Sequence, residues 1–167
     1  ASMMIGWDQK IQATHIAKRN PGLILLAYGT NEANGKFERS EYEAGLRRVI
    51  ARLRAAAPAA SILLVGPPDC RLRSDRTLGQ VIESQIRIAL SAGCAFWHWR
   101  DHMGGEGSMR YWVAAGLAQG DHIHFSQTGY QLIGRTLSQE LLLQYERFAA
   151  ARVEPQTGVQ ESVTNQA

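Results

Sequence analysis

Two side chains in the last third of the chain have the types and spacing of the acid–base part of a hydrolytic site. Asp121 and His124 stand three residues apart in a short stretch before an amphipathic segment. A carboxylate that orients an imidazole, and an imidazole that takes a proton from a nucleophile, are two members of a hydrolytic triad. Both could lie on one loop, so that placing one side chain nearly places the other. The alternative is that they only mark the start of a helix, with Ser126 as its N-cap.

Composition and charge place the chain among single-domain globular proteins. It has 167 residues, of which 45% are hydrophobic and 20% are charged, enough for one sizeable core. The net charge is +3 and the basic residues are scattered, so we expect no nucleic-acid partner. No apolar run approaches the roughly 20 residues that span a bilayer. The start of the chain has no signal-peptide pattern.

Short apolar runs alternate with segments of helical periodicity, which is typical of a parallel α/β sheet. A polar tail, expected to be disordered, follows the domain 1–152 at 153–167. The expected strands are 23–28, 61–66 and 94–97, and the expected helices are 7–20, 40–57, 77–92 and 126–151.

Local patterns add three finer predictions. The continuous apolar run 23–28 predicts a strand buried on both faces. Ser40, with Glu43 three residues later, predicts a capping box at the start of a helix. The stretches 29–35 and 100–120 are expected to be irregular loops.

The loops that follow the strands should meet at one rim. Parallel α/β folds bind ligands beyond the carboxyl ends of their strands. The loop after the first strand contains Asn31, and this topology brings Asn31 near Asp121 and His124.

Two cysteines, Cys70 and Cys94, lack the spacing of a zinc knuckle or a CxxC redox pair. Free thiols are the favoured interpretation, and one disulfide stays open if the compartment is oxidising.

Two motifs in this order resemble the SGNH (GDSL-type) hydrolases. One is the apolar strand that runs into Gly29-Thr30-Asn31-Glu32, and the other is Asp121-x-x-His124. Three further sequence stretches are similar to the peptidoglycan O-acetylesterase branch of that family. They are Leu26-Ala27-Tyr28-Gly29-Thr30-Asn31-Glu32-Ala33, Val65-Gly66-Pro67-Pro68-Asp69, and Met103-Gly104-Gly105-Glu106-Gly107-Ser108-Met109 with Trp112.

The resemblance implies a role for each matched side chain. Asn31 would donate its amide to the oxyanion, His124 would be the general base and then acid, and Asp121 would fix the tautomer of His124. Glu32 would hold the loop. The resemblance also implies a serine esterase without a cofactor or metal. Its substrate would be an O-acylated carbohydrate such as O-acetylated peptidoglycan, and the enzyme would be periplasmic or otherwise exported.

The sequence departs from the family in its first two blocks. No Gly-Asp-Ser nucleophile block is present, and Gly6 is a poor match for the second block. Ser2 has no strand before it, Ser108 lies in a Gly-rich loop without a strand-to-helix turn, and Ser126 suits a helix cap. We therefore expect the nucleophile upstream of Ala1. The chain would then be the C-terminal part of a flavodoxin-like three-layer α/β/α fold that lacks its N-terminal strand or strands.

Two alternatives remain open on the sequence. The histidines in His98-x-x-x-His102 and in Asp121-His122-x-His124 could contribute to a metal-dependent hydrolase site. A non-catalytic glycan-binding module would instead use an aromatic groove, although core packing is the favoured role for Trp97. The aromatic residues in question are Trp97, Trp99, Tyr111 and Trp112.

Overall fold

The structure, a computed structural model, describes residues 9–71 and 75–153. These fall into two units, one up to Gly129 and one from Tyr130 onward, and each is described by itself. The expected tail at 153–167 lies outside the described residues, apart from Val153, which ends the last helix.

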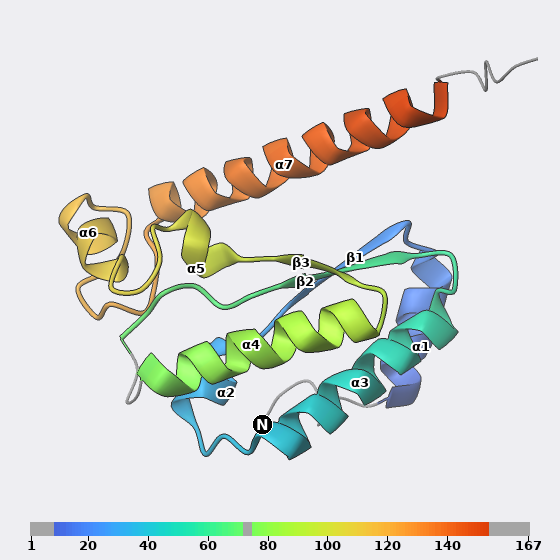
Figure 1. The fold of residues 1–167 in the computed structure, drawn as a ribbon, viewed down its shortest axis with the longest axis horizontal. Helices are drawn as coiled ribbons and strands as arrows, with labels where there is room; N and C mark the ends of the chain where they lie inside the picture. Colours follow the sequence, from blue (N-terminus) through green and yellow to red (C-terminus); the bar gives the residue numbers. More distant parts are fainter. Residues whose placement is uncertain (1–8, 72–74, 154–167) are drawn as a thin grey trace, which may run out of the picture. The chain divides into compact units, whose positions relative to one another are not determined.

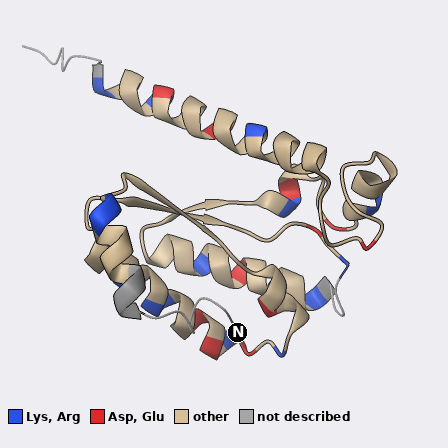
Figure 2. Cartoon of the chain, turned by 180° about the vertical axis from the view of Figure 1, so that it is seen from behind, with Lys and Arg blue, Asp and Glu red and all other residues tan. Residues whose placement is uncertain are grey.

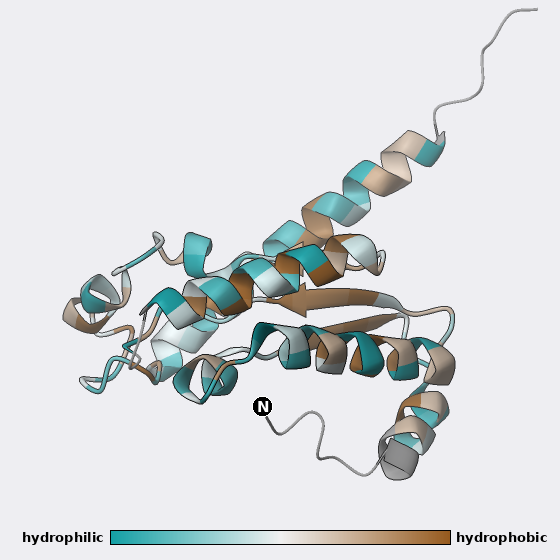
Figure 3. Cartoon of the chain, turned by 60° about the horizontal axis from the view of Figure 1, so that its bottom comes forward, coloured by the Kyte–Doolittle hydropathy of each residue, from teal (hydrophilic) through white to brown (hydrophobic). Residues whose placement is uncertain are grey.

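A three-stranded parallel sheet lies at the centre of the first unit. Its order is β1-β2-β3, and Leu23 pairs with Ser61 while Leu63 pairs with Ala95. Figure 3 shows the strands among the most hydrophobic parts of the ribbon. The predicted parallel α/β sheet is confirmed. The strands are β1 (Leu23–Ala27), β2 (Ser61–Val65) and β3 (Ala95–Trp97).

The first strand is less buried than its apolar sequence predicts. Successive side chains of a strand point to opposite faces, and Leu23 and Leu25 on one face are 42% and 49% exposed. On the other face Leu26 is buried. Within the described part of the chain, β1 is an edge strand that pairs only with β2. In contrast, β2 lies between two strands and is buried from Ile62 to Val65. The prediction of burial on both faces is therefore wrong for β1, whereas β2 is buried on both faces.

Long helices cover the sheet. Figure 1 shows α3 and α4 side by side against one face of the strands, and α1 contacts α3. Both α3 and α4 bury a stripe of apolar side chains at helical spacing, such as Leu46, Val49 and Leu53 of α3. The helices are α1 (Gln9–Arg19), α3 (Arg39–Ala56) and α4 (Asp75–Ser91).

The capping box expected at Ser40 is absent. Helix α3 begins at Arg39, with Glu38 as the N-cap and no side-chain cap hydrogen bond. The carboxylate of Glu43 instead pairs with Arg87 of α4 at 2.7 Å. A tertiary ion pair thus replaces the local contact that the sequence pattern predicts.

Three short helices occupy stretches that we expected to be irregular. They are too short to show a helical period in the sequence, which explains why the prediction missed them. Figure 1 shows them at the end of the sheet where the strands finish. They are α2 (Thr30–Asn34), α5 (Trp99–His102) and α6 (Met109–Ala114).

The chain ends in the long helix α7 (Gln127–Val153). Ser126 caps it as predicted, because its Oγ accepts a hydrogen bond from the Gly129 N–H at 3.1 Å. No helix of the described residues is both long enough and apolar enough to cross a membrane. Figure 2 shows charges of both signs along α3, α4 and α7.

The first turn of α7 provides a stability prediction. A Cβ at Gly129 would overlap the carbonyl oxygen of Leu117, whereas one at Gly134 meets nothing within 4 Å. Gly134→Ala should stabilise the protein by up to about 1 kcal/mol through helix propensity. Gly129→Ala should instead lower the free energy of unfolding by about 1–3 kcal/mol through overpacking. Urea denaturation measures both changes, and equal stabilisation by the two variants would contradict the predicted overlap.

Candidate active site

Asp121 and His124 form a hydrogen-bonded pair, as the sequence predicts. The Oδ2 of Asp121 lies 2.6 Å from the Nδ1 of His124. The other carboxylate oxygen accepts hydrogen bonds from the backbone N–H groups of Ile123 at 2.9 Å and His124 at 3.0 Å. An ionised carboxylate only accepts hydrogen bonds, so this arrangement places a proton on Nδ1 and leaves Nε2 free to act as a base.

These hydrogen bonds stabilise the charged form of Asp121. They hold the pKa of the Asp121 carboxyl well below its usual range, first through the His124 side chain and then through the two backbone N–H groups. Because the folded-state pKa is lowered, the stabilisation is present above the ordinary pKa of Asp and is lost as the pH falls through the lowered value. The carboxylate therefore stays ionised in mild acid.

The pKa shift makes a direct prediction. In a pH titration followed by NMR, the Asp121 carboxyl carbon should show no transition near pH 4, close to the ordinary Asp value of about 3.9. His124→Ala removes the largest cause of the shift and should move the transition back toward that value. A normal Asp121 titration in the unmodified protein would contradict the hydrogen bond.

A tight turn holds the pair in place. An antiparallel bridge joins Ala118 to Phe125 at its base, and the Gln119 N–H donates to the His124 carbonyl at 2.7 Å. Within the turn, His122 has a φ of 59°, a left-handed conformation that is uncommon for residues other than glycine. The Arg71 N–H donates to the His122 carbonyl at 2.9 Å and ties the turn to the segment that follows β2.

Asn31 lies on α2, where it lines a cavity of about 230 Å³ at the carboxyl ends of β1 and β2. Gly29 starts this helix with a φ of 133°. A Cβ there would approach the ring carbons of Pro67 to 2.9 Å, so both the conformation and the space require glycine. Glu32 is buried and its carboxylate accepts the Gly29 N–H at 3.0 Å. This contact matches the loop-holding role expected of Glu32.

A buried polar network contacts Tyr28, a lining residue of the cavity, and was not predicted from the sequence. Gln85 donates to the Tyr28 carbonyl at 2.7 Å and to the Tyr42 hydroxyl at 2.9 Å. Burial raises the pKa of the Tyr42 hydroxyl far above its usual range, so the hydroxyl stays neutral. The available signal was the position of Gln85, a polar residue within the apolar stripe of α4.

Trp99 connects the two parts of the site. Its side chain lines the cavity around Asn31. Its ring also stacks on Phe125, next in sequence to His124, with centroids 5.4 Å apart. His124 itself is not among the residues that line the cavity, and the contact of Trp99 links the cavity to the residue next to His124 in sequence.

No described serine is placed as a nucleophile beside His124. The Ser126 hydroxyl donates to the Gly116 carbonyl at 2.8 Å and also caps α7. The Ser108 side chain is buried, and its Oγ has no hydrogen-bond partner that could activate it. Ser2 lies outside the described residues.

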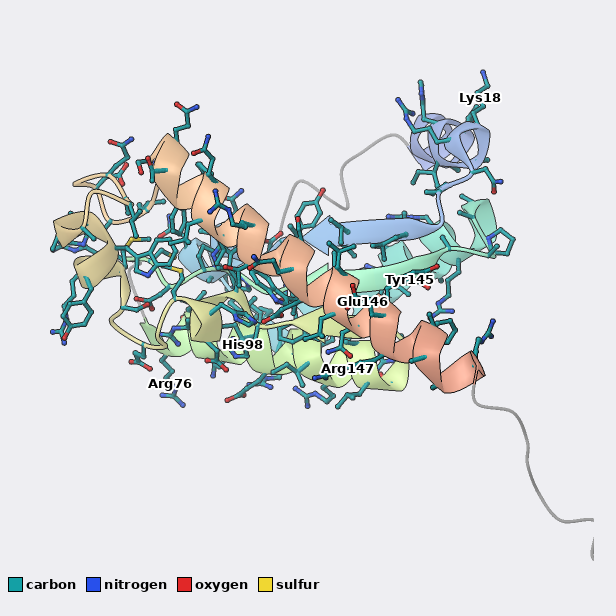
Figure 4. The ribbon with its side chains drawn as sticks, turned by 90° about the horizontal axis from the view of Figure 1, so that it is seen from above. Lys18, Arg76, His98, Tyr145, Glu146 and Arg147 are labelled. Carbon is teal, nitrogen blue, oxygen red and sulfur yellow. The ribbon has the colours of Figure 1, made fainter. Side chains whose placement is uncertain are left out.

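The histidines of the metal alternative have structural contacts. The Nδ1 of His98, which is labelled in Figure 4, accepts the Asp101 N–H at 3.2 Å and caps α5. The ring of His102 stacks on Trp97 with centroids 4.5 Å apart. Within 9–71 and 75–153, no three or more His, Cys, Asp and Glu side chains group so as to hold a metal ion.

The cysteines and aromatic residues have ordinary structural environments. Cys70 and Cys94 do not form a disulfide with each other, in agreement with the thiols favoured on the sequence. Trp97 is buried as expected, and Trp112 is buried with its indole N–H donating to the Met103 carbonyl. Tyr111 is 62% exposed.

Comparison with known proteins identifies the family. The model of the GDSL-like lipase/acylhydrolase family matches residues 5–132, and the chain belongs to this family. The resemblance inferred from the two motifs is thus confirmed. None of the curated proteins matches the sequence.

Solved structures agree with this assignment. A peptidoglycan O-acetylesterase is 32% identical with a TM-score of 0.77, and the similarity covers 82% of this chain and 41% of that one. The chain thus spans less than half the length of that esterase chain. The lipase/acylhydrolase from Enterococcus faecalis (17% identity, TM-score 0.60, 81% and 71% covered) shares the fold. An aryl esterase from M. smegmatis also shares the fold, with 13% sequence identity and a TM-score of 0.57. The similarity covers 80% of this chain and 66% of that one.

Proposed function

We propose that this chain is part of a serine esterase that removes O-acetyl groups from a carbohydrate, with peptidoglycan as the favoured substrate. The observation that carries the proposal is the 2.6 Å contact between Asp121 and His124 in the position of the family's base and orienter. The likeness to a peptidoglycan O-acetylesterase supports the choice of acyl group and glycan. It also supports export to the periplasm or cell surface, where such a polymer lies.

The proposed chemistry follows from the hydrogen-bond pattern. With its Nδ1 proton held by Asp121, the Nε2 of His124 accepts the proton of a serine hydroxyl as that oxygen attacks the ester carbonyl. Asn31 donates its side-chain amide to the oxygen that becomes negative. His124 then returns the proton to the departing sugar oxygen. Water cleaves the acyl-enzyme by the same steps in reverse.

The proposal places the nucleophile outside residues 1–167. This is supported by the Ser108 and Ser126 hydroxyls, neither of which forms a hydrogen bond with the His124 ring. Among the described residues β1 is an edge strand, and Leu23 and Leu25 are exposed on one of its faces. A further strand that carries the serine could pair there and cover this apolar surface. The partner of this chain would then be another part of the same protein.

Asn31→Ala tests the oxyanion role. Loss of one oxyanion donor lowers kcat by about 10²–10³-fold in other hydrolases, and we expect a similar loss here. The assay is hydrolysis of an aryl acetate by the chain expressed together with the coding sequence that precedes Ala1. Asn34→Ala, the same change at an exposed position of the same helix, is the matched control. An unchanged kcat for Asn31→Ala would assign this residue to turn structure instead.

A further inference from the structure

A second hollow, of about 430 Å³, opens beside the Asp121–His124 turn. It shares no lining residue with the cavity around Asn31. Cys70 and Met109 are buried and give it an apolar floor, while Arg71, Arg110 and His122 bring basic side chains to it.

The acidic residues of this hollow compensate only part of its positive charge. Asp69 is buried, and its two oxygens accept hydrogen bonds from the Arg100 Nε and the Met109 N–H, both at 2.9 Å. Its charge is therefore already neutralised within the protein. Glu106 is a solvent-exposed carboxylate whose nearest cation is the buried Arg100, at 3.5 Å.

The two arginines at the hollow keep donors available for a ligand. Arg71 is exposed, and its guanidinium forms no hydrogen bond or ion pair with any described residue. Arg110 lies over the ring of Tyr111 at 4.6 Å and donates one hydrogen bond to the Tyr111 hydroxyl. A guanidinium has five N–H donors, so most of those on Arg110 are not used by the described residues. Paired N–H donors match the two oxygens of a carboxylate.

The hollow lies close to the proposed reaction centre. His122 lines it and is two residues from His124, so their Cα atoms are at most about 7 Å apart. The Arg71 N–H donates a hydrogen bond to the His122 carbonyl at 2.9 Å, which holds Arg71 next to the turn that carries His124. The hollow and the proposed base therefore border the same short turn.

We propose that this hollow is a subsite for a carboxylate on the alcohol side of the ester, bound by Arg71 and Arg110. The inference rests on the proposed esterase function and narrows its substrate to an acidic glycan. The carboxylate could belong to the sugar itself or to a peptide attached to it. The apolar floor would contact the carbon skeleton that carries the charge.

Binding measured by NMR tests the subsite without turnover. The protein, expressed with its preceding coding sequence, is titrated with N-acetylmuramic acid, with its carboxyl-reduced form, and with a short alanyl peptide. We expect the acidic sugar or the peptide to shift the signals of Arg71 and Arg110, with about tenfold weaker binding of the reduced sugar. Whichever acid binds identifies the source of the carboxylate. Equal binding of the acidic and reduced sugars, or no shift at either arginine, would overturn the proposal.

Variants that remove the charge of the two arginines provide a second test of the carboxylate subsite. Arg71→Gln combined with Arg110→Gln should weaken binding of the acidic ligand about tenfold. Arg48→Gln, on the exposed side of α3, is the matched control. Undiminished binding by the double variant would refute the subsite. Failure to hydrolyse the aryl acetate in the unmodified protein would instead count against the esterase function, independently of the binding result.

Discussion

His124→Ala is expected to lower kcat for an acetyl ester by about 10⁴-fold or more, because no other group would take the proton from the nucleophile. The fold should persist, since the ring of His124 is exposed and its only hydrogen bond with a described residue is to Asp121. The measurement is the steady-state rate of aryl-acetate hydrolysis, with circular dichroism to check folding.

His15→Ala is the matched control for this substitution. His15 lies on the exposed side of α1, outside both cavities, and its loss should leave kcat unchanged. A His124 variant that keeps kcat within tenfold of the unmodified protein would show that another group is the base.

Asp121→Asn should lower kcat by about 10⁴-fold, the loss seen when the orienting carboxylate of a triad becomes an amide. The amide oxygen can still accept the two backbone N–H bonds of the turn, so the turn should persist. The amide group, however, would present donors to His124 and favour the wrong tautomer. The same assay measures this effect.

Asp101→Asn provides the comparison for that change. Asp101 is also paired with a histidine three residues away, at 3.5 Å from the His98 Nδ1, yet it is exposed and lines neither cavity. It should keep full activity. If Asp121→Asn also kept full activity, the carboxylate would have only the structural role of holding the turn.

Much of this architecture was predictable because it depends on local sequence signals. Continuous aliphatic runs marked the strands, and the stretches of helical period between them required parallel crossovers. The topology then predicted that Asn31 would lie at the carboxyl end of the sheet, where the cavity is found. The hydrogen bond between Asp121 and His124 followed from their spacing on one turn.

What the sequence could not predict depends on tertiary context. The exposure of Leu25 reflects the edge position of β1, which an apolar run does not reveal. Glu43 pairs with Arg87 of another helix rather than capping its own. The role of Gln85 appears only when α4 is packed against the Tyr28 carbonyl. Catalytic roles for Asn31, Asp121 and His124 remain predictions.

The most direct test is the rate of aryl-acetate hydrolysis by the 167-residue chain, measured with and without the coding sequence that precedes Ala1. We predict turnover only for the longer protein, and its loss on His124→Ala. Robust turnover by the 167-residue chain alone, abolished by Ser108→Ala or Ser2→Ala, would contradict the account and identify the nucleophile within these residues.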